Sequence, residues 1–362
     1  MERRTLLIVW LVLVVLSGCT KSPPPVVAPP PTNGPEPTVT VQPSEPPKPV
    51  MPAVSPRVET PRPQPDAALR ALVAKFVVAN DAGGWRTNEA AALELERLGT
   101  EGPAKVLGFL TDPQLDVRRG AAYFLIGSFD PNNPEQVTAF ANLLKDQDPT
   151  LRGIGLLAVK KMRVADVAAV QPQLIALLEA SQESKPENRA TVARFAGNLL
   201  QRGAAYAPAL TKTATEDPDE RVRSAAVFAL TQVSQAEEYT ATLIKILSDP
   251  QPGVRLVAAS RLRSLNAQAL PAVDALGKAL SDEDERVRTV AAEALTRIGL
   301  LAVPTLGEQL SSKDVNARKL ALACLGGLGT AAKSELAKIE KLQQDPDATV
   351  RGAAKELAER LK

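Results

Sequence analysis

Histidine is absent from the 362-residue chain, and this absence excludes several classes of function at once. Ser-His-Asp and Cys-His catalysis, histidine general bases and histidine-containing zinc sites all need an imidazole. Asp and Glu remain available for acid-base chemistry or for calcium, but the acidic turn at 282–285 recurs in form at 217–220 and 345–347, and no turn matches an EF-hand loop. Such repetition is typical of helix capping. We therefore predict that the chain is not an enzyme and uses neither a metal nor another cofactor.

Aromatic residues, net charge and cysteine are scarce as well. Aromatic residues make up 3% of the chain, so we expect an aliphatic core. The net charge is +2 and no basic tract is interleaved with aromatic residues, which argues against a nucleic-acid partner. The two cysteines are Cys19 and Cys324. Cys324 stands where Ala294 stands in its own repeat, so we expect a small buried residue rather than a reactive thiol.

A recurring motif organises the C-terminal three quarters of the chain. Its fullest copy, residues 281–299, has an acidic turn, the core V-R-x-x-A-A-x-A-L and a final glycine. Val287, Ala291 and Leu295 share one face of a helix, the aspartates suit its N-terminus, and Gly299 suits the left-handed conformation that ends it. Successive copies lie 30 to 37 residues apart and contain Arg118, Arg152, Arg189 (a weak copy), Arg223, Arg255, Arg288, Arg318 and Arg351, with a degenerate copy at Arg86 before them.

A second helical segment lies between most motif helices. Pro172, Pro208, Pro271 and Pro304 stand near the starts of four of these segments, where the missing N–H of proline costs little. A fixed period of this length with two helices per unit is the signature of a solenoid. The segments are 137–144, 171–178, 207–214, 241–247, 271–280, 304–310 and 335–342.

The motif D-P-x-x-x-V-R-x-x-A-A-x-A-L resembles the HEAT-repeat family, in particular its short-unit, phycobilisome-lyase-like branch. The resemblance implies an all-α fold, an armadillo/HEAT-like α-solenoid of about eight to nine helix-pair repeats over residues 66–362. It also implies that the motif aspartates and arginines link neighbouring repeats in a structural ladder. The aspartates concerned are Asp112, Asp217, Asp249, Asp282 and Asp345.

The N-terminus reads as an export signal. Two arginines precede an apolar run at 6–16, which is too short to cross a bilayer as a helix. The run ends in Leu-Ser-Gly-Cys, which resembles the bacterial lipobox, so residues 1–18 are predicted to be a lipoprotein signal peptide and Cys19 the lipidated first residue of the mature chain. Thr20 follows Cys19, and the resemblance to the sorting rule of diderm bacteria then favours the outer membrane. An ordinary signal peptide with an incidental cysteine is the alternative.

Residues 19–65 are predicted to form a disordered, proline-rich linker. Seventeen prolines lie between Pro23 and Pro65 and no aromatic residue occurs there, so the segment cannot bury a core. It reads as a tether between the lipid and the repeats. A proline-motif ligand for an SH3-like partner is the functional alternative.

Positions one, five, eight and nine residues after each motif arginine should face solvent, opposite the apolar stripe. They are rich in cations, which suggests a basic stripe along the motif helices, with Glu293 as an exception. Solubilising charge on a helix face explains such a stripe equally well; our hypothesis is contact with an acidic protein segment or an anionic envelope polymer. The candidate partner-binding residues are Arg119, Tyr123, Lys160, Lys161, Arg194, Arg263, Arg297 and Lys319.

These features together predict an exported lipoprotein, anchored to a bacterial membrane at the outer membrane, its periplasmic side or the cell surface. Its repeats would act as a scaffold for a protein partner in the cell envelope. A structural spacer without a dedicated partner is the main alternative. A bilin lyase-like role, implied by the short-unit branch, fits an exported chain without histidine poorly.

Overall fold

The computed structural model describes residues 67–79, 85–180 and 182–362, without the side chains of residues 200, 201 and 237. The predicted signal peptide, Cys19 and the proline-rich linker lie outside the described residues. The domain boundary between residues 65 and 66 therefore stays a prediction.

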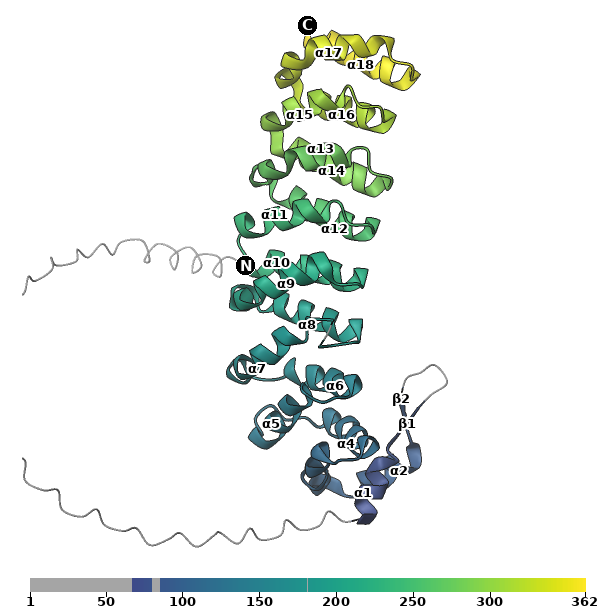
Figure 1. Cartoon of the computed structure of the whole chain (residues 1–362), viewed down its shortest axis with the longest axis vertical. Helices are drawn as coiled ribbons and strands as arrows, with labels where there is room; N and C mark the ends of the chain where they lie inside the picture. The colour runs from purple at the N-terminus through teal and green to yellow at the C-terminus, as the bar shows by residue number, and fades with distance from the viewer. Residues whose placement is uncertain (1–66, 80–84, 181) are drawn as a thin grey trace, which may run out of the picture. The chain divides into compact units, whose positions relative to one another are not determined.

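Each strong motif arginine lies on one of a series of helices that stack along one side of the described chain (Figure 1). Their amphipathic pattern predicts this arrangement, because a helix with one apolar face must bury it against a neighbour. Even the weak copy at Arg189 forms such a helix. These motif helices are α4 (Leu115–Gly127), α6 (Pro149–Val159), α8 (Pro186–Asn198), α10 (Glu220–Val233), α12 (Pro252–Ser264), α14 (Glu285–Ile298), α16 (Val315–Leu328) and α18 (Ala348–Leu361).

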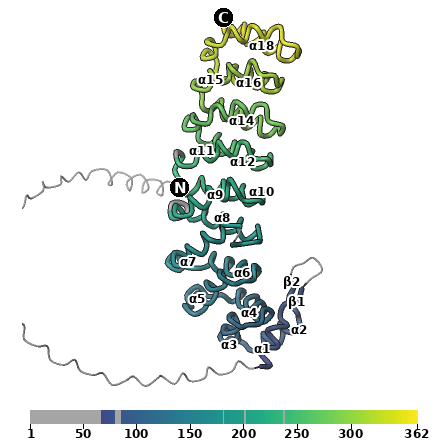
Figure 2. The backbone as a smooth tube through the Cα atoms, viewed as in Figure 1, coloured from purple at the N-terminus to yellow at the C-terminus, as the bar shows by residue number. Residues whose placement is uncertain are grey.

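Second helices occupy the other side of the stack, one between each two motif helices, as Figure 2 shows. The all-α solenoid expected from the sequence is thereby confirmed. Their bounds need two corrections: α7 begins before Pro172, which lies inside the helix, and Pro271 lies in a 3₁₀ segment, Asn266–Ala272, rather than at a helix start. The second helices are α5 (Pro134–Leu143), α7 (Val164–Ala176), α9 (Ala207–Glu216), α11 (Ala236–Ile246), α13 (Val273–Ala279), α15 (Val303–Gln309) and α17 (Leu336–Lys341).

The helix ends follow the local sequence. The side chains of Asp219, Asp284 and Asp347 accept hydrogen bonds from backbone N–H groups in the first turns of α10, α14 and α18, which satisfies donors that have no partner within the helix. Gly299 follows α14 with φ at +82°, in the positive region that favours glycine. Aspartate and glycine thus mark the two ends of the fullest motif copy.

The first repeat departs from the expectation. The sequence predicts a degenerate motif copy at Arg86, but α1 (Ala67–Ala74) is followed by β1 (Val77–Ala79), which pairs antiparallel with β2 (Trp85–Thr87). Arg86 therefore lies on a strand and is not a motif arginine. The chain then forms α2 (Glu89–Glu96) and α3 (Gly102–Leu107) before α4. The run Phe-Val-Val before a glycine-containing segment favours a strand over a helix.

The core is a continuous aliphatic layer between the two sides of the stack. Leu125, Leu230 and Leu295 are fully or almost fully buried, and alanines such as Ala226 allow the helices to approach closely. The stretch Glu285–Gln309 is apolar and long enough to cross a membrane, but it comprises α14, a 3₁₀ turn and α15, and more than half of its most apolar window is buried in the stack. Its apolar residues therefore belong to the repeat core.

Candidate functional site

A ladder of arginine–carboxylate pairs links neighbouring repeats on the motif-helix side. In each pair, Nε of the arginine donates to one carboxylate oxygen at 2.7 to 2.9 Å and Nη2 donates to the other at 2.8 to 3.2 Å. This bidentate geometry fixes the register of one repeat on the next. The pairs are Arg70–Asp112, Arg118–Asp146, Arg152–Glu183, Arg189–Asp217, Arg223–Asp249, Arg255–Asp282 and Arg318–Asp345.

The ladder confirms the structural role expected for the motif aspartates and shows how it works. Each motif arginine from Arg118 to Arg351 also donates through Nη1 to the backbone carbonyl six residues before it, at 2.7 to 2.9 Å. An arginine of the ladder thus binds a backbone carbonyl in the acidic turn before its own helix, and it also binds the carboxylate in the acidic turn of the next repeat. Arg70 on α1 is the first arginine of the ladder, the position that the sequence pattern predicted for Arg86.

The charges of the ladder residues are paired with one another and largely buried. The side chains of Arg189 and Asp217 are only 3% and 2% exposed, so this pair is almost completely removed from water. The hydrogen bonds from Arg318 hold the pKa of Asp345 below its ordinary value, and those from Arg70 lower the pKa of Asp112. Because these charges are matched within the stack, the paired ladder residues have no free charge to offer a partner.

One rung of the ladder lacks its carboxylate. Ser312 stands six residues before Arg318, where the other repeats have Asp or Glu, and Arg288 forms no ion pair with any described residue. Nη1 of Arg288 still donates to the carbonyl of Asp282 at 2.8 Å. The interface between the repeats of α14 and α16 is therefore stabilised by packing, without the ion pair that links the other repeats.

The structure corrects the prediction that Arg119 faces solvent. Its guanidinium donates to the carboxylate of Asp148, with Nη2 2.6 Å from Oδ2, and it lies 4.3 Å from the centre of the Trp85 ring. Its side chain is only 16% exposed. Tyr123 is half-buried nearby, and desolvation followed by the charge of Asp148 raises the pKa of its phenol. Arg119 thus ties the hairpin strand β2 to α4 and to the turn before α6.

Two more candidates form ion pairs with the next repeat. Arg263 on α12 pairs with Glu293 on α14, and Nζ of Lys319 on α16 lies 3.1 Å from the carboxylate of Asp347. Both cations are partly exposed, but each has an anion beside it. The basic stripe is consequently interrupted at Arg119, Arg263 and Lys319.

The remaining candidates are exposed cations without a carboxylate partner among the described residues. Lys160 and Lys161 end α6, and Arg194 lies on α8, where it donates to the hydroxyl of Thr191 at 3.4 Å. Lys161 reaches the carbonyl of Ile126, 3.5 Å away. Arg297 is exposed near the end of α14. These three residues of two neighbouring repeats are called the exposed cluster, although Lys161 is directed toward α4, on the opposite side of α6 from α8, and Arg297 lies apart from them on α14.

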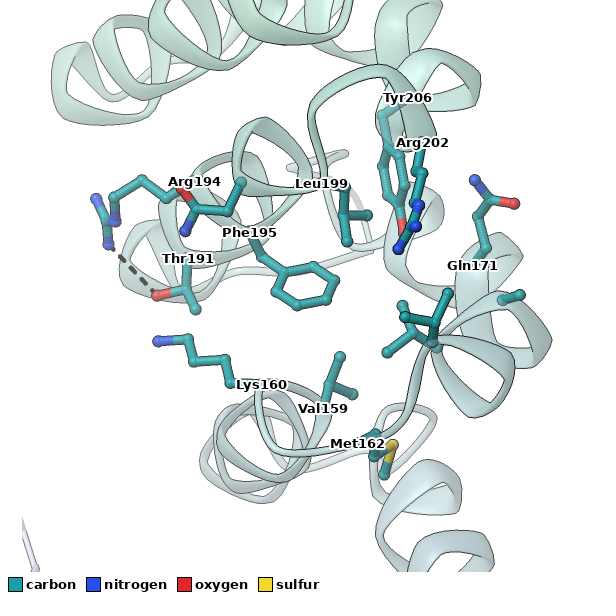
Figure 3. Close-up of a pocket in the computed structure, with 14 residues that line it drawn as sticks. Val159, Lys160, Met162, Gln171, Thr191, Arg194, Phe195, Leu199, Arg202 and Tyr206 are labelled. Carbon is teal, nitrogen blue, oxygen red and sulfur yellow. Dashed lines mark hydrogen bonds between the residues drawn. The ribbon is translucent and has the colours of Figure 1, made fainter. Parts of the chain in front are cut away.

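A cavity of about 730 Å³ lies beside this cluster, between the α6–α7 pair and α8 with the 3₁₀ segment Leu200–Tyr206 that follows it (Figure 3). Lys160 and Arg194 line it together with Arg202 and Tyr206, which the sequence analysis did not select. Arg202 and Tyr206 follow the motif helix and fall outside the positions counted from Arg189. The weak motif and the longest interval in the series, between Arg152 and Arg189, were the available signals that this repeat differs from the others.

Other chemistry-bearing groups add no site. The described residues contain no group of three or more Cys, Asp or Glu side chains arranged to hold a metal ion. Cys324 is buried as expected, its Sγ lies 3.4 Å from the carbonyl oxygen of Ala292, and burial raises the pKa of the thiol. This environment disfavours the thiolate.

Several solved structures match the chain at low sequence identity. A chain of the Kap95:Nup1 complex matches with a TM-score of 0.50 and 15% identity over 79% of this chain and 43% of its own length. Importin beta matches with a TM-score of 0.49 and 16% identity, covering 81% of this chain and 44% of its own. An engineered protein matches with a TM-score of 0.40 and 18% identity, covering 81% and 94%. No curated protein matches the chain.

A family model for HEAT repeats matches residues 137–231, 240–301 and 273–358, which together span more than half of the chain. The match covers most of the residues of the helices from α5 to α18 and the ladder pairs from Arg152–Glu183 onward. The chain therefore belongs to the HEAT-repeat family.

Proposed function

We propose that the protein is a membrane-anchored scaffold of the cell envelope that binds a partner protein through its motif helices. The observation that carries this proposal is the exposed cluster Lys160, Lys161 and Arg194, which lacks carboxylate partners among the described residues. Elsewhere on the motif helices, Arg119, Arg263 and Lys319 are neutralised by acidic residues of the next repeat.

An acidic segment of a partner protein fits this cluster by charge. Unpaired cations on a rigid surface raise the association rate of an anionic partner and favour it over a basic one. A stack of helices offers such a segment a long surface, and the Kap95:Nup1 structure is a protein complex of a chain with a similar fold. Fold alone does not name a partner, so the proposal rests on the cluster.

The anchor would be lipid on Cys19. The proline-rich linker of residues 20–65 spans roughly 140 Å if it is extended at about 3.1 Å per residue, and about 35–40 Å as a flexible coil. Within that range the repeats would stand clear of the membrane while remaining attached to it. Multiple acyl chains hold a protein firmly, whereas a single short chain does not.

Site-specific photo-crosslinking in cells tests the scaffold role. A photoreactive amino acid replaces Lys161 on the cluster side in the full-length protein, and in a second strain it replaces Lys245, which is exposed on α11 on the other side of the stack. We expect one reproducible protein adduct from position 161 and none of that mass from position 245. Mass spectrometry of the adduct identifies the partner and the crosslinked segment, which should be acidic.

Charge reversal provides the matched control. Lys161→Glu with Arg194→Glu should abolish partner capture at a third position nearby, such as Leu157, which is exposed on α6, without changing helicity. Lys245→Glu with Lys278→Glu makes the same charge change on exposed second-helix residues and should leave capture intact. Capture that survives reversal of the cluster, or adducts that are the same from both sides, would favour the spacer alternative.

The anchor has a separate test. Metabolic labelling with a clickable fatty acid should mark the wild-type protein and leave Cys19→Ala unlabelled. Membrane fractionation should then move Cys19→Ala to the soluble fraction. Labelling that persists in Cys19→Ala would contradict the predicted site.

A further inference from the structure

The cavity beside α8 is large enough for a small molecule. Its volume of about 730 Å³ lies within the roughly 300–1,000 Å³ that is typical of ligand sites. Figure 3 shows Val159 and Met162 on one side of the space, Phe195 and Leu199 on another, and Tyr206 and Arg202 pointing into it. The cavity shares Lys160 and Arg194 with the exposed cluster of the proposed protein partner, but Tyr206 is fully buried and is not part of that cluster.

The irregular repeat explains why the cavity occurs here. The interval from Arg152 to Arg189 is 37 residues, the longest in the series, and α7 has 13 residues whereas the other second helices have 6 to 11. Pro172 lies inside α7, where it removes a backbone hydrogen bond. A longer second helix that contains a proline cannot pack on its neighbour as the shorter ones do, and space remains between the two repeats.

Tyr206 supplies a deep polar group in this space. The residue is fully buried, and its hydroxyl has no hydrogen-bond partner in the described part of the chain. Burial raises its pKa to about 12, so the hydroxyl keeps its proton at neutral pH and remains a donor. An unsatisfied buried hydroxyl costs free energy, and an acceptor in the cavity would remove that cost.

The positive charge of the cavity wall favours a ligand whose hydrogen-bond acceptor is anionic. Lys160, Arg194 and Arg202 line it, and none of its described lining residues is Asp or Glu. Arg202 and the hydroxyl of Tyr206 both point into the cavity, while the rest of the wall is dominated by aliphatic side chains and Phe195 (Figure 3). A ligand must therefore combine one anionic head with an apolar body.

We propose that this cavity binds an aliphatic carboxylate, a single-chain fatty-acid type of molecule. Its carboxylate accepts a hydrogen bond from the Tyr206 hydroxyl and forms an ion pair with Arg202. Its chain lies against Val159, Met162, Phe195 and Leu199. The peptide alternative, the free C-terminus of a protein that ends in an apolar residue, presents the same carboxylate but also a series of polar amides, for which the wall offers only Gln171, Thr191 and Asn198 as uncharged polar partners.

Calorimetric titration with dodecanoate, below its micellar concentration, tests the site. The full-length Cys19→Ala protein is used, so that no lipid of its own competes. We expect one molecule bound per chain, and no binding of dodecyltrimethylammonium, which has the same chain and the opposite charge. Tyr206→Phe removes only the hydroxyl and Arg202→Gln only the charge, so each should weaken binding about tenfold.

Two controls and one blocking variant make the result specific. Tyr239→Phe changes another buried tyrosine outside the cavity, and Arg297→Gln removes an exposed charge outside it; neither should alter the affinity. Ala168→Trp fills the cavity from an exposed position on α7 and should abolish binding while the melting temperature stays unchanged.

The proposal is overturned if dodecanoate does not bind, if it binds with the same affinity to Tyr206→Phe and Arg202→Gln, or if Ala168→Trp still binds it. It is also overturned if a short peptide with a C-terminal leucine binds in a Tyr206-dependent manner and dodecanoate does not. Tyr206, Arg202 and Ala168 are not substituted in the tests of the scaffold role, which use Lys161 and Arg194, so failure of one proposal leaves the other standing.

Discussion

Restoring the missing rung of the ladder should stabilise the C-terminal repeats. Ser312→Asp places a carboxylate opposite Arg288, whose Nη1 is already fixed on the carbonyl of Asp282 at 2.8 Å. The backbone at 312 has the ladder geometry, because Arg318 donates to the carbonyl of Ser312 at 2.9 Å and the N–H of Asp314 donates to the Ser312 hydroxyl at 3.2 Å. The new side chain therefore enters a position that is prepared for it.

The expected gain is about 1–2 kcal/mol. Hydrogen bonds to charged groups contribute roughly 1.5–3 kcal/mol when buried, and exposed ion pairs about 0.2–1 kcal/mol. Arg288 is half-buried, which places this pair between the two. Asp314 would repel the new carboxylate, as Asp347 raises the pKa of Asp345, but there the hydrogen bond from Arg318 outweighs the repulsion and the net pKa is lowered.

Hydrogen exchange and urea unfolding measure the effect. Because each repeat contacts mainly its neighbours, the end of the stack opens first, so amide protection in α16 and α18 should rise while that in α10 stays the same. The melting temperature of the transition in which the C-terminal repeats unfold should rise by about 2–4 °C for each kcal/mol gained.

A double-mutant cycle decides whether the ion pair is the cause. In Arg288→Met, the Ser312→Asp substitution should give no gain, since the carboxylate then has no partner. An equal gain in both backgrounds would refute the ladder explanation and point instead to an effect of the new charge on the turn. A loss of stability in the wild-type background would refute the expected geometry.

Three further outcomes follow from single contacts. Asp217→Asn leaves Arg189 buried without its anion and should lower the free energy of unfolding by about 3–5 kcal/mol in urea titrations; a change below about 1 kcal/mol would contradict the burial of this pair. Gly120→Ala puts a Cβ 1.9 Å from a backbone oxygen of α1 and should destabilise by about 1–3 kcal/mol, whereas Gly127→Ala on the same helix has free space and should be neutral or stabilising in thermal melts. In a spectrophotometric pH titration of the folded protein, Tyr206 should ionise near pH 12. Because its folded pKa is above the unfolded value of about 10, its contribution to stability is complete below pH 10 and is lost as the pH rises toward 12. Ionisation near pH 10 in the folded protein would show that the phenol is solvated.

The local sequence accounts for most of the elements. The apolar spacing around Val287 and Leu295 specifies a helix, Asp284 begins it and Gly299 ends it, because capping and left-handed backbone are properties of a few adjacent residues. The repeat period alone predicts the wrong element at Arg86, because the strand-forming residues around it favour an antiparallel strand pair. Pro172 also predicts a helix start, but α7 accommodates it inside the helix.

The sequence by itself determined the repeat, the order of its helices and which residues form the core, since these depend on a pattern that each unit contains. Only the tertiary structure decided which charges remain free. Arg119 and Lys160 occupy exposed-face positions of their repeats by sequence, yet Arg119 is matched by Asp148 and Lys160 has no described carboxylate beside it. Whether a cation meets an anion depends on how neighbouring repeats stack in register, and whether Tyr206 lines a cavity depends on how far those repeats are held apart. Both are distances between helices, which no single helix encodes.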